Sequence, residues 1–319
     1  MRILTFTTLY PSAARPNFGV FVENRLRHLV ATGAVESRVV APVPWFPLRH
    51  RCFGEYGRFA ATPRAETRHG LDVLHPRYAL LPKAGMTMAP FSLFASGLRV
   101  LRTLIRTGYD FDLIDAHYFY PDGVAAVWLG RALRKPVVVT ARGTDINLIP
   151  RYRRTRAMII RAGQGAAAMV AVCQALKDEM VALGMDGARI RVLRNGVDLT
   201  LFTPHARDAA RARFGITRPA LVAVGGLIER KAHDIAVRAM ALLPDMELLI
   251  AGEGEQRRPL EKLIGDLGLS GRVRLLGAVP HADLAALYSA ADISLLTSSR
   301  EGWANVLLEA MACGTPVVA

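Results

Sequence analysis

Short runs of aliphatic and β-branched residues recur along the first 200 residues and alternate with longer stretches of helical periodicity. Residues 20–32 form one such helical stretch, and Gly33 ends it. Strands are predicted over residues 2–7, 38–42, 71–77, 111–117, 136–141, 168–173 and 190–193. Short apolar strands that alternate with helices are typical of a parallel sheet covered on both faces.

The same alternation restarts in the last third of the chain. Strands are predicted over residues 220–224, 247–251, 272–276, 292–296 and from 316 onward, with helices over 282–290 and 305–313. The pattern therefore predicts an α/β protein with two Rossmann-like, doubly wound domains. We expect these domains to span residues 1–200 and 218–319, joined by a connector over residues 201–217.

Two segments fit this alternation less well. Residues 45–67 are basic and contain Pro and Gly, so they are predicted to form an irregular loop, which either binds an acceptor or simply connects two strands. Residues 86–101 are apolar enough to lie on a membrane, but a core helix is the favoured interpretation. No uninterrupted apolar stretch reaches about 18 residues, so no membrane span is expected.

The net charge of +14 is carried entirely by residues 1–200, whereas residues 201–319 are balanced. The densest basic cluster consists of Arg151, Arg153, Arg154, Arg156 and Arg161. A basic face favours contact with an anionic membrane or a phosphate-bearing acceptor, and an ordinary Arg-rich surface is the alternative. No nucleic-acid-binding motif accompanies the charge, so no nucleic acid partner is expected.

The three cysteines, Cys52, Cys173 and Cys313, are far apart and form no CxxC or metal-ligand pattern. They are expected to be reduced, mostly buried thiols of a cytosolic protein. No signal peptide is expected, because the short apolar run near the N-terminus is interpreted as the first strand.

Polar residues follow several predicted strands, at the sheet edge where open parallel sheets bind ligands. Gly19 lies at a strand–loop–helix junction, where a backbone without Cβ can approach a ligand, although a simple turn is the alternative. His117 ends one predicted strand, and Arg142 and Asp145 follow the next. The first strand is not followed by GxGxxG, which argues against a dinucleotide site there.

The second domain offers two candidate anion-binding segments. Its first strand is followed by Gly225, Gly226, Arg230 and Lys231, a set of flexible glycines and adjacent cations that suits a diphosphate. A solvated pair of loop cations is the alternative.

The second segment contains Glu301 and Glu309, which are separated by seven residues. Glu301 follows a strand, and Glu309 lies one turn beyond Asn305 on the same helix face. The helix N-terminus between them presents free amides to an anion, and both carboxylates can accept hydrogen bonds from sugar hydroxyls. The spacing fits a nucleotide-sugar site, and equally a surface loop followed by a solvated helix glutamate.

Five motifs taken in order resemble the retaining glycosyltransferases of family 4, which have the GT-B fold. The carrying motif is EGWANVLLEAMACGTPVVA, residues 301–319, and the supporting motifs lie at 195–198, 225–231, 251–254 and 276–277. The resemblance covers nearly the whole chain and implies two facing Rossmann-like domains with the active site in the cleft. Family members continue for tens of residues past the strand in which this chain ends, so the second domain is expected to be truncated at its C-terminus.

The resemblance also implies roles for individual residues. Lys231, assisted by Arg230, would neutralise the diphosphate, Glu309 would accept hydrogen bonds from the ribose, and Glu301 would contact the donor sugar. Further donor contacts are implied for Gly19, Gly225, Gly226, Val279, Gly302, Trp303, Ala304, Asn305 and Val306.

The reacting centre implied by the resemblance includes His117 together with Lys231 and Glu301, and Arg142 and Asp145 would lie on the acceptor side. Retaining transfer places negative charge on the leaving diphosphate, which cations and helix amides would stabilise. The two glutamates are therefore assigned to hydroxyl binding and not to the acid–base pair of a glycosidase.

Three positions depart from the family pattern: Gly226 replaces an Arg, Arg142 replaces a His, and Ala232 replaces a Gly. The first of these removes one expected contact with the diphosphate.

The implied activity is transfer of a sugar from a nucleotide diphosphate sugar, taken as a UDP-sugar, to a saccharide or lipid-linked acceptor of a cell-surface polysaccharide or glycolipid. No cofactor or metal is expected, because the nucleotide sugar is a substrate. The expected location is the cytoplasm, with peripheral contact at the inner face of the membrane. The alternatives are a non-catalytic nucleotide-sugar-binding protein and an epimerase or hydrolase on the same fold.

Overall fold

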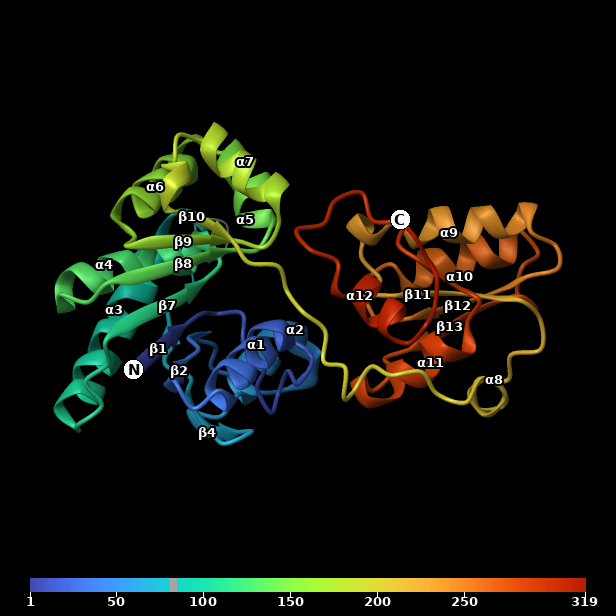
Figure 1. The fold of residues 1–319 in the computed structure, drawn as a ribbon, viewed down its shortest axis with the longest axis horizontal. Helices are drawn as coiled ribbons and strands as arrows, with labels where there is room; N and C mark the ends of the chain where they lie inside the picture. Colours follow the sequence, from blue (N-terminus) through green and yellow to red (C-terminus); the bar gives the residue numbers. More distant parts are fainter. Residues whose placement is uncertain (81–84) are drawn as a thin grey trace. The chain divides into compact units, whose positions relative to one another are not determined.

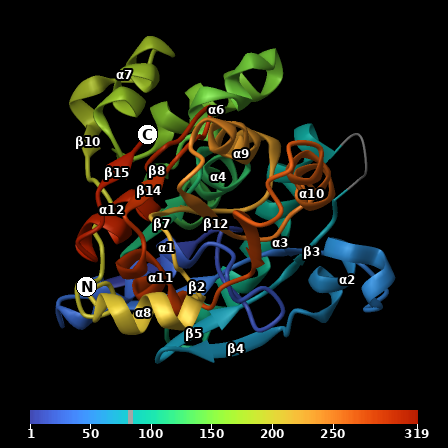
Figure 2. The same cartoon turned by 90° about the vertical axis from the view of Figure 1, so that its right-hand side faces the viewer.

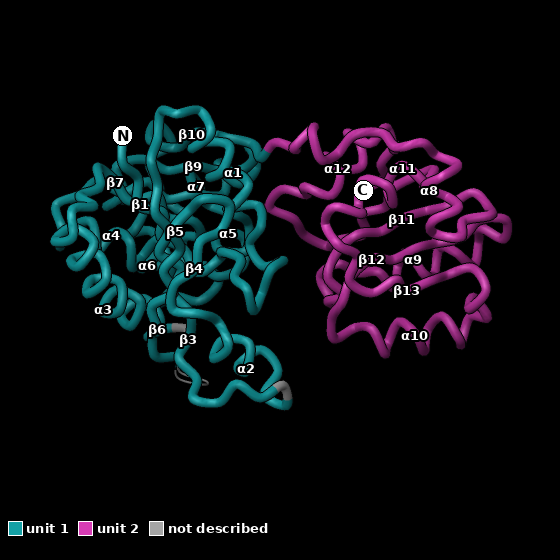
Figure 3. Tube along the Cα trace, turned by 90° about the horizontal axis from the view of Figure 1, so that it is seen from below, with its two compact units in different colours: residues 1–195 teal, residues 196–319 magenta. Residues whose placement is uncertain are grey.

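The computed structural model describes residues 1–80 and 85–319. The chain divides into two compact units, unit 1 over Met1–Asn195 and unit 2 over Gly196–Ala319 (Figure 3). Each unit is built around its own largely parallel β-sheet (Figure 1). The predicted fold class, α/β with two Rossmann-like doubly wound domains, is confirmed.

Unit 1 contains an eight-stranded sheet in the order β10-β9-β8-β7-β1-β2-β5-β4. The strands are β1 (Arg2–Phe6), β2 (Glu36–Val40), β4 (Ala65–Arg68), β5 (Leu71–Leu74), β7 (Leu113–His117), β8 (Val137–Ala141), β9 (Ala168–Ala171) and β10 (Ile190–Val192). Only β4 and β5 pair antiparallel among these described strands, and they lie side by side at one edge (Figure 2). A separate parallel pair, β3 (Val43–Pro44) and β6 (Arg77–Tyr78), lies next to α2 (Gly54–Ala61).

Helices cover both faces of this sheet. On one face, Val22 and Leu26 of α1 (Val20–Ala31) pack on Val39 of β2. On the other, Gly97 of α3 (Gly85–Arg106) lies against the ring of Phe6. Phe6 pairs in register with Val40, so the two side chains point to the same face of the sheet. Val39 and Val40 are neighbours in one strand and point to opposite faces, so α1 and α3 cover opposite faces. The remaining helices are α4 (Val124–Leu133), α5 (Thr144–Asn147), α6 (Arg153–Gly165) and α7 (Gln174–Ala182).

Helix α3 contains Thr87–Arg106, the one helix within residues 1–80 and 85–319 that is long and apolar enough to cross a membrane. Length and composition alone are weak evidence for a span. Leu93 and Leu101 of this helix are fully buried, and the Ser96 hydroxyl donates to the Arg77 carbonyl at 2.9 Å. One face of the helix is therefore buried as the expected core helix would be, whereas Met88 and Phe91 of the same helix are exposed.

Unit 2 contains a five-stranded parallel sheet in the order β13-β12-β11-β14-β15. The strands are β11 (Ala220–Val224), β12 (Glu247–Ala251), β13 (Val273–Gly277), β14 (Ile293–Leu295) and β15 (Val317–Val318). Val222 and Leu249 pack with α8 (Arg207–Phe214) and α11 (Leu284–Ala290). Their neighbours Leu221 and Leu248 point to the other face and pack with α9 (His233–Ala239) and α10 (Arg257–Asp266). Helix α12 (Asn305–Ala312) precedes the last strand.

Each sheet reverses its winding direction beside its first strand. In unit 1, β1 lies between β2 and β7, and in unit 2, β11 lies between β12 and β14. Doubly wound sheets bind ligands outside the carboxyl ends of the strands at this switch point. Gly19 and His117 follow or end such strands in unit 1, and Lys231 and Glu301 follow them in unit 2.

Three local expectations were wrong. Residues 45–67 are not irregular, because α2 and β4 occupy part of them; Phe59 and Ala60 lie one turn beyond Tyr56, a helical spacing. The strand expected over 71–77 ends at Leu74, because Pro76 has no amide to extend the pairing. Cys52 is exposed and Cys173 is half-buried, so the thiols are not mostly buried as expected, although all three cysteines are free.

The predicted domain boundaries at residues 200 and 218 stay predictions. In the structure α8 lies within the predicted connector and belongs to unit 2. Arg211 of α8 reaches Asp292 with an N···O distance of 3.4 Å, and Asp292 also accepts a hydrogen bond from the Ala220 amide at 2.7 Å. The connector is therefore anchored to the first strand of the second sheet.

Candidate functional site

In unit 2, two loops meet at the switch point and bring together three charged side chains predicted for the site. Lys231 Nζ donates a hydrogen bond to Glu301 Oε1 at 2.7 Å, and Arg230 lies 3.1 Å from the same oxygen. The Ser299 amide donates to the Arg230 carbonyl at 3.0 Å, which ties the backbones of the two loops together. Loop pairing therefore places Glu301 beside the cations although 70 residues separate them in the sequence.

The three side chains are half-buried, so their charges interact strongly and still reach solvent. Burial alone would raise the pKa of Glu301, but the hydrogen bond and the positive charge of Lys231 outweigh it and hold that pKa below its ordinary value. Glu301 is therefore ionised at neutral pH. Two cations share one carboxylate, and this leaves a net positive charge at the carboxyl end of β11.

The glycines before Lys231 have different surroundings. A Cβ added at Gly225 would lie 3.2 Å from Cε of Lys231, so this glycine leaves room for the lysine stem. A Cβ added at Gly226 would meet only the Glu253 carbonyl oxygen, at 3.7 Å. Gly226 is exposed and open to a larger side chain, whereas Gly225 is held close to the cation.

Glu309 lies on α12 and does not share the contacts of Glu301. Its Oε2 accepts a hydrogen bond from the Tyr288 hydroxyl at 3.1 Å. Burial raises the pKa of Glu309 to about 7, although the hydrogen bond from Tyr288 lowers it. Glu309 therefore changes charge near neutral pH, which sequence reasoning did not anticipate.

The other donor contacts predicted in unit 2 are partly exposed. Gly302, Trp303, Ala304, Asn305 and Val306 are all half-buried and form the loop and first turn of α12. Val279 packs against the apolar cluster that contains Phe202 and Tyr288. These positions are compatible with a ligand, and their roles stay predictions.

In unit 1, His117 belongs to a buried network with Asp115 and Arg142, in which Nε of Arg142 has no hydrogen-bond partner among the described residues. Its Nε2 lies 3.1 Å from Asp115 Oδ2, and Arg142 donates to its Nδ1 at 2.6 Å. Arg142 also donates to Asn195 Oδ1 at 3.1 Å. Burial lowers the pKa of His117 to about 4, and the charge of Arg142 acts in the same direction against that of Asp115. The imidazole is therefore neutral, with both ring nitrogens occupied.

Asp145 holds the loop between β8 and α5 from inside. Its carboxylate accepts hydrogen bonds from the amides of Phe119 (2.7 Å), Arg142 (3.0 Å) and Gly143 (2.8 Å), and its side chain is completely buried. A buried carboxylate that accepts three backbone amides fixes the loop geometry. The structure thus accounts for Asp145 as a framework residue, and its predicted place on the acceptor side stays a prediction.

Gly19 is required by packing. It has φ 73°, and an added Cβ would lie 2.5 Å from the backbone of Leu9. The loop after β1 passes directly against the start of α1, which only a residue without Cβ allows. Gly19 is itself buried.

Sequence reasoning missed Asp122, which is completely buried beside the strand end at His117. Asp122 accepts hydrogen bonds from the Thr8 amide at 2.7 Å and from the Thr8 hydroxyl at 3.0 Å. Burial raises the pKa of Asp122 to about 7 against these hydrogen bonds. The sequence feature that could have indicated Asp122 is the pair Thr7-Thr8 directly after the first strand, because two adjacent hydroxyl groups at a buried strand end need a hydrogen-bond acceptor.

Among the described residues, no group of three or more His, Cys, Asp or Glu side chains is arranged to hold a metal ion. The expectation that no metal takes part stays a prediction.

Both units of the chain match models of known glycosyltransferase families. Residues 19–201, more than half of the chain, match the model of Glycosyltransferase Family 4. The chain belongs to glycosyltransferase family 4. Residues 206–319 match the model described as Glycosyl transferases group 1, so the two matches together cover nearly all of both units. The predicted family and enzyme class are confirmed: this family 4 member is a glycosyltransferase.

Two relatives are similar to this family 4 chain in sequence. TuaC of Bacillus subtilis (strain 168), named for teichuronic acid biosynthesis, is 29% identical over 325 residues, a match that covers 100% of this chain and 80% of TuaC. The D-inositol 3-phosphate glycosyltransferase of Mycolicibacterium smegmatis is 45% identical over 141 residues, which are 42% of this chain and 32% of that enzyme.

Solved structures confirm the GT-B fold expected of the family. Sucrose-phosphate synthase from Thermosynechococcus elongatus superposes with a TM-score of 0.77 at 19% identity, over 99% of this chain and 80% of that one. Anabaena HepE, solved in complex with UDP, superposes with a TM-score of 0.74 at 22% identity, over 100% and 80% of the two chains.

Proposed function

We propose that this family 4 enzyme transfers a sugar, with retention of configuration, from a UDP-sugar to a saccharide or lipid-linked acceptor of a cell-surface polysaccharide or glycolipid. HepE, which shares the fold, binds UDP and UDP-glucose, and TuaC is named for a cell-wall polysaccharide. These names support the choice of donor and product class.

The observation that carries the proposal is the group of Arg230, Lys231 and Glu301 at the switch point of unit 2. A diphosphate brings negative charge that the two cations neutralise, and Glu301 is left to accept hydrogen bonds from hydroxyls of the donor sugar. As the sugar–phosphate bond breaks, negative charge grows on the leaving diphosphate. Lys231 lies in a half-buried site, where its charge stabilises that group better than an exposed cation would.

The rest of unit 2 completes the proposed donor site. Glu309 accepts hydrogen bonds from the ribose, Gly225 and Gly226 let the backbone approach the diphosphate, and Val279 lies at the base. The amides of residues 302–306 contact the sugar and phosphate. No metal is needed in this scheme, because Lys231 supplies the positive charge.

We propose that unit 1 presents the acceptor and the remaining groups near the reacting centre. His117 is neutral and paired at both nitrogens, so its ring is suited to hold the neighbouring loop in place and not to exchange protons. Gly19 keeps its predicted place near the diphosphate, and Arg142 and Asp145 keep theirs on the acceptor side.

We also propose that unit 1 contacts an anionic membrane at the cytoplasmic face. Two of its surfaces support this: the exposed arginines at the start of α6, and the exposed apolar side chains of Trp45, Leu48, Phe53 and Tyr56 around α2. Aromatic side chains favour the lipid interface and arginines favour anionic headgroups. Cosedimentation with vesicles containing one third phosphatidylglycerol tests this, and equal binding to neutral vesicles would count against it.

The donor assignment is tested with Glu301→Gln, which keeps the size of the side chain and removes its charge. We expect its transfer from UDP-sugars to fall by about 100-fold, the loss typical of one well-placed polar group. Its affinity for UDP alone should stay the same or rise, because Lys231 loses a competing internal anion. Sugar transfer to lipid extracts and calorimetric titration with UDP measure the two quantities.

Unchanged transfer by Glu301→Gln would contradict the role of Glu301. Binding of UDP-sugar by the wild-type chain without any transfer or hydrolysis would instead favour the alternative of a non-catalytic binding protein. Titration with GDP alongside UDP tests the choice of base.

A further inference from the structure

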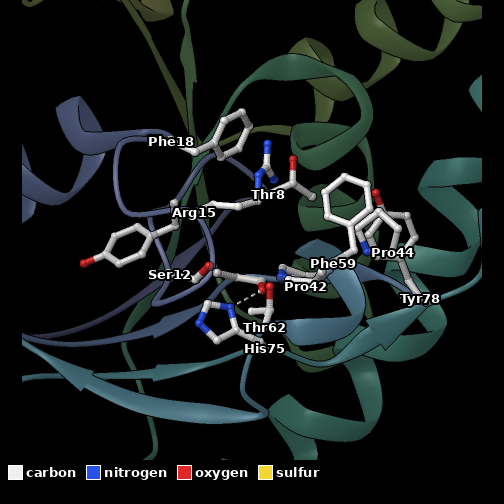
Figure 4. Close-up of a pocket in the computed structure, with 13 residues that line it drawn as sticks. Thr8, Ser12, Arg15, Phe18, Pro42, Pro44, Phe59, Thr62, His75 and Tyr78 are labelled. Carbon is white, nitrogen blue, oxygen red and sulfur yellow. Dashed lines mark hydrogen bonds between the residues drawn. The ribbon is translucent and has the colours of Figure 1, made fainter. Parts of the chain in front are cut away.

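A pocket of about 150 Å³ lies in unit 1 at the carboxyl ends of β1, β2 and β5 (Figure 4). The loop after β1 contributes Thr8, Arg15 and Phe18, α2 contributes Phe59, and β6 contributes Tyr78. We call it the Arg15 pocket. Its volume is well below the roughly 300 Å³ at which sites for whole ligands begin, so it accommodates one small group of a larger molecule.

Arg15 is the charged side chain of this pocket and is largely withdrawn from water. Its side chain is 20% exposed, and its guanidinium lies 3.6 Å from the ring centroid of Phe18 and 5.0 Å from that of Phe59. Figure 4 shows the side chain running toward Thr8 with the two rings on either side. Burial lowers the pKa of Arg15, because the surroundings solvate its charge poorly.

The N–H groups of the Arg15 guanidinium are available to a ligand. The guanidinium donates no hydrogen bond to any described residue, and its charged partner is Glu55, whose Oε2 lies 3.3 Å from Nε. Glu55 is half-exposed and also accepts a hydrogen bond from Arg58 at 2.7 Å, so its hold on Arg15 is weak. A desolvated cation with donors to spare is costly unless an anion binds it.

The other walls suit a sugar ring that carries such an anion. Phe18 and Phe59 offer apolar faces, and the Thr8 hydroxyl lines the pocket. Burial raises the pKa of Tyr78, so its phenol stays protonated and able to donate. The fork of a guanidinium matches the two oxygens of a carboxylate or phosphate.

We propose that the Arg15 pocket binds the carboxylate or phosphate of an acidic sugar unit, and that this unit belongs to the acceptor. That the sugar unit belongs to the acceptor rests on the proposed function, whereas binding of an acidic sugar by the pocket does not. His117 and Arg142 do not line this pocket, and Arg142 donates instead to Nδ1 of His117 at 2.6 Å.

The test measures binding of matched sugars to the full chain by saturation-transfer and titration NMR. The probes are methyl glucoside, methyl glucuronide and glucose 6-phosphate, which differ in the presence and kind of anion. Wild type should bind at least one acidic probe about tenfold or more tightly than the neutral one, the usual worth of hydrogen bonds to a charged group. Tighter binding of methyl glucuronide would indicate a carboxylate as the natural group, and tighter binding of glucose 6-phosphate would indicate a phosphate.

Three variants locate the binding. Arg15→Gln should abolish the preference for acidic probes, and Arg15→Lys should retain part of it, because the charge stays while the fork is lost. Glu55→Gln should strengthen binding of the acidic probe a few-fold, since a competing anion is gone. The urea unfolding curve followed by circular dichroism should be unchanged in all three, which shows that each variant is folded.

Equal binding of neutral and acidic probes by wild type, or a preference that survives in Arg15→Gln, would overturn the proposal. Transfer assays separate its failure from that of the proposed function. If acidic sugars bind through Arg15 and no sugar is transferred, the proposed function fails and the pocket stands. If transfer occurs equally to neutral and acidic acceptors, the pocket inference fails and the proposed function stands.

Discussion

At the switch point of unit 2, Arg230 and Lys231 share one carboxylate, Glu301, and all three side chains reach solvent. At the switch point of unit 1, His117 has each ring nitrogen paired within the protein and is fully buried. Both regions place charged residues at the carboxyl ends of parallel strands. The difference is whether the charges have been satisfied internally.

This difference separates framework from binding site. A buried group whose partners are all internal stabilises one loop conformation, and its removal should be felt first as lost stability. A half-buried cation that shares one carboxylate has capacity left for a ligand, so its removal should be felt first as lost affinity. In unit 1, Arg15 is a side chain in that second state, whereas both ring nitrogens of His117 are paired.

The largest effect is expected from Asp145→Ala. It leaves three buried amides without an acceptor and should lower the free energy of unfolding by about 4 kcal/mol. Urea unfolding followed by circular dichroism measures this loss. The exposed Asp178→Ala on α7 is the control and should change stability by less than about 0.5 kcal/mol. A loss below about 1 kcal/mol for Asp145→Ala would show that the unit 1 network is not a framework.

Lys231→Met should come next. It keeps the aliphatic stem, removes the cation, and should weaken UDP binding by about 100-fold, or about 2.7 kcal/mol, with little change in unfolding free energy. The exposed Lys262→Met on α10 carries the same change away from the site and should bind UDP as wild type does. If both variants bind UDP equally well, Lys231 does not contribute to binding of an anionic ligand.

The raised pKa of Glu309 should make the affinity for UDP depend on pH, an effect of intermediate size among these predictions. Below a pH of about 7 its carboxylate is protonated and becomes a poorer acceptor for ribose hydroxyls, so UDP affinity should fall by about tenfold between pH 8 and pH 6. The Glu309→Gln variant is the control, because UDP phosphate titrates in this range by itself and any slope left in the variant belongs to the ligand. Identical slopes in the two proteins would rule out Glu309 as the titrating group.

The smallest effect is expected from Gly226→Arg, which restores the family's usual residue at an open position. The added cation should tighten UDP binding by about 1 kcal/mol, or about fivefold. Gly226→Ala should be neutral, whereas Gly225→Ala crowds the Lys231 stem and should weaken binding. Weaker UDP binding in Gly226→Arg would mean that the loop has no room or that the diphosphate lies elsewhere.

Much of the architecture follows from local sequence. The strands Ala220–Val224 and Glu247–Ala251 were predicted with their observed bounds, because fully buried parallel strands are continuous apolar runs with clear ends. Helix α2 was missed, because Gly54, Gly57 and Pro63 mark a loop locally whereas packing of Phe59 and Ala60 decides for the helix. Packing overrides propensity in short segments of this kind.

The chain's order of motifs, the spacing of Glu301 and Glu309, and the cations after Gly225 determined the family and the candidate donor residues without any coordinates. Only the tertiary structure decided that Lys231 holds Glu301, that Glu309 is held by Tyr288, and that His117 is enclosed while Arg15 is left with donors to spare. The physical reason is that strand and helix patterns depend on neighbours in sequence. Burial and charge pairing depend instead on which loops the sheet order brings to the same edge.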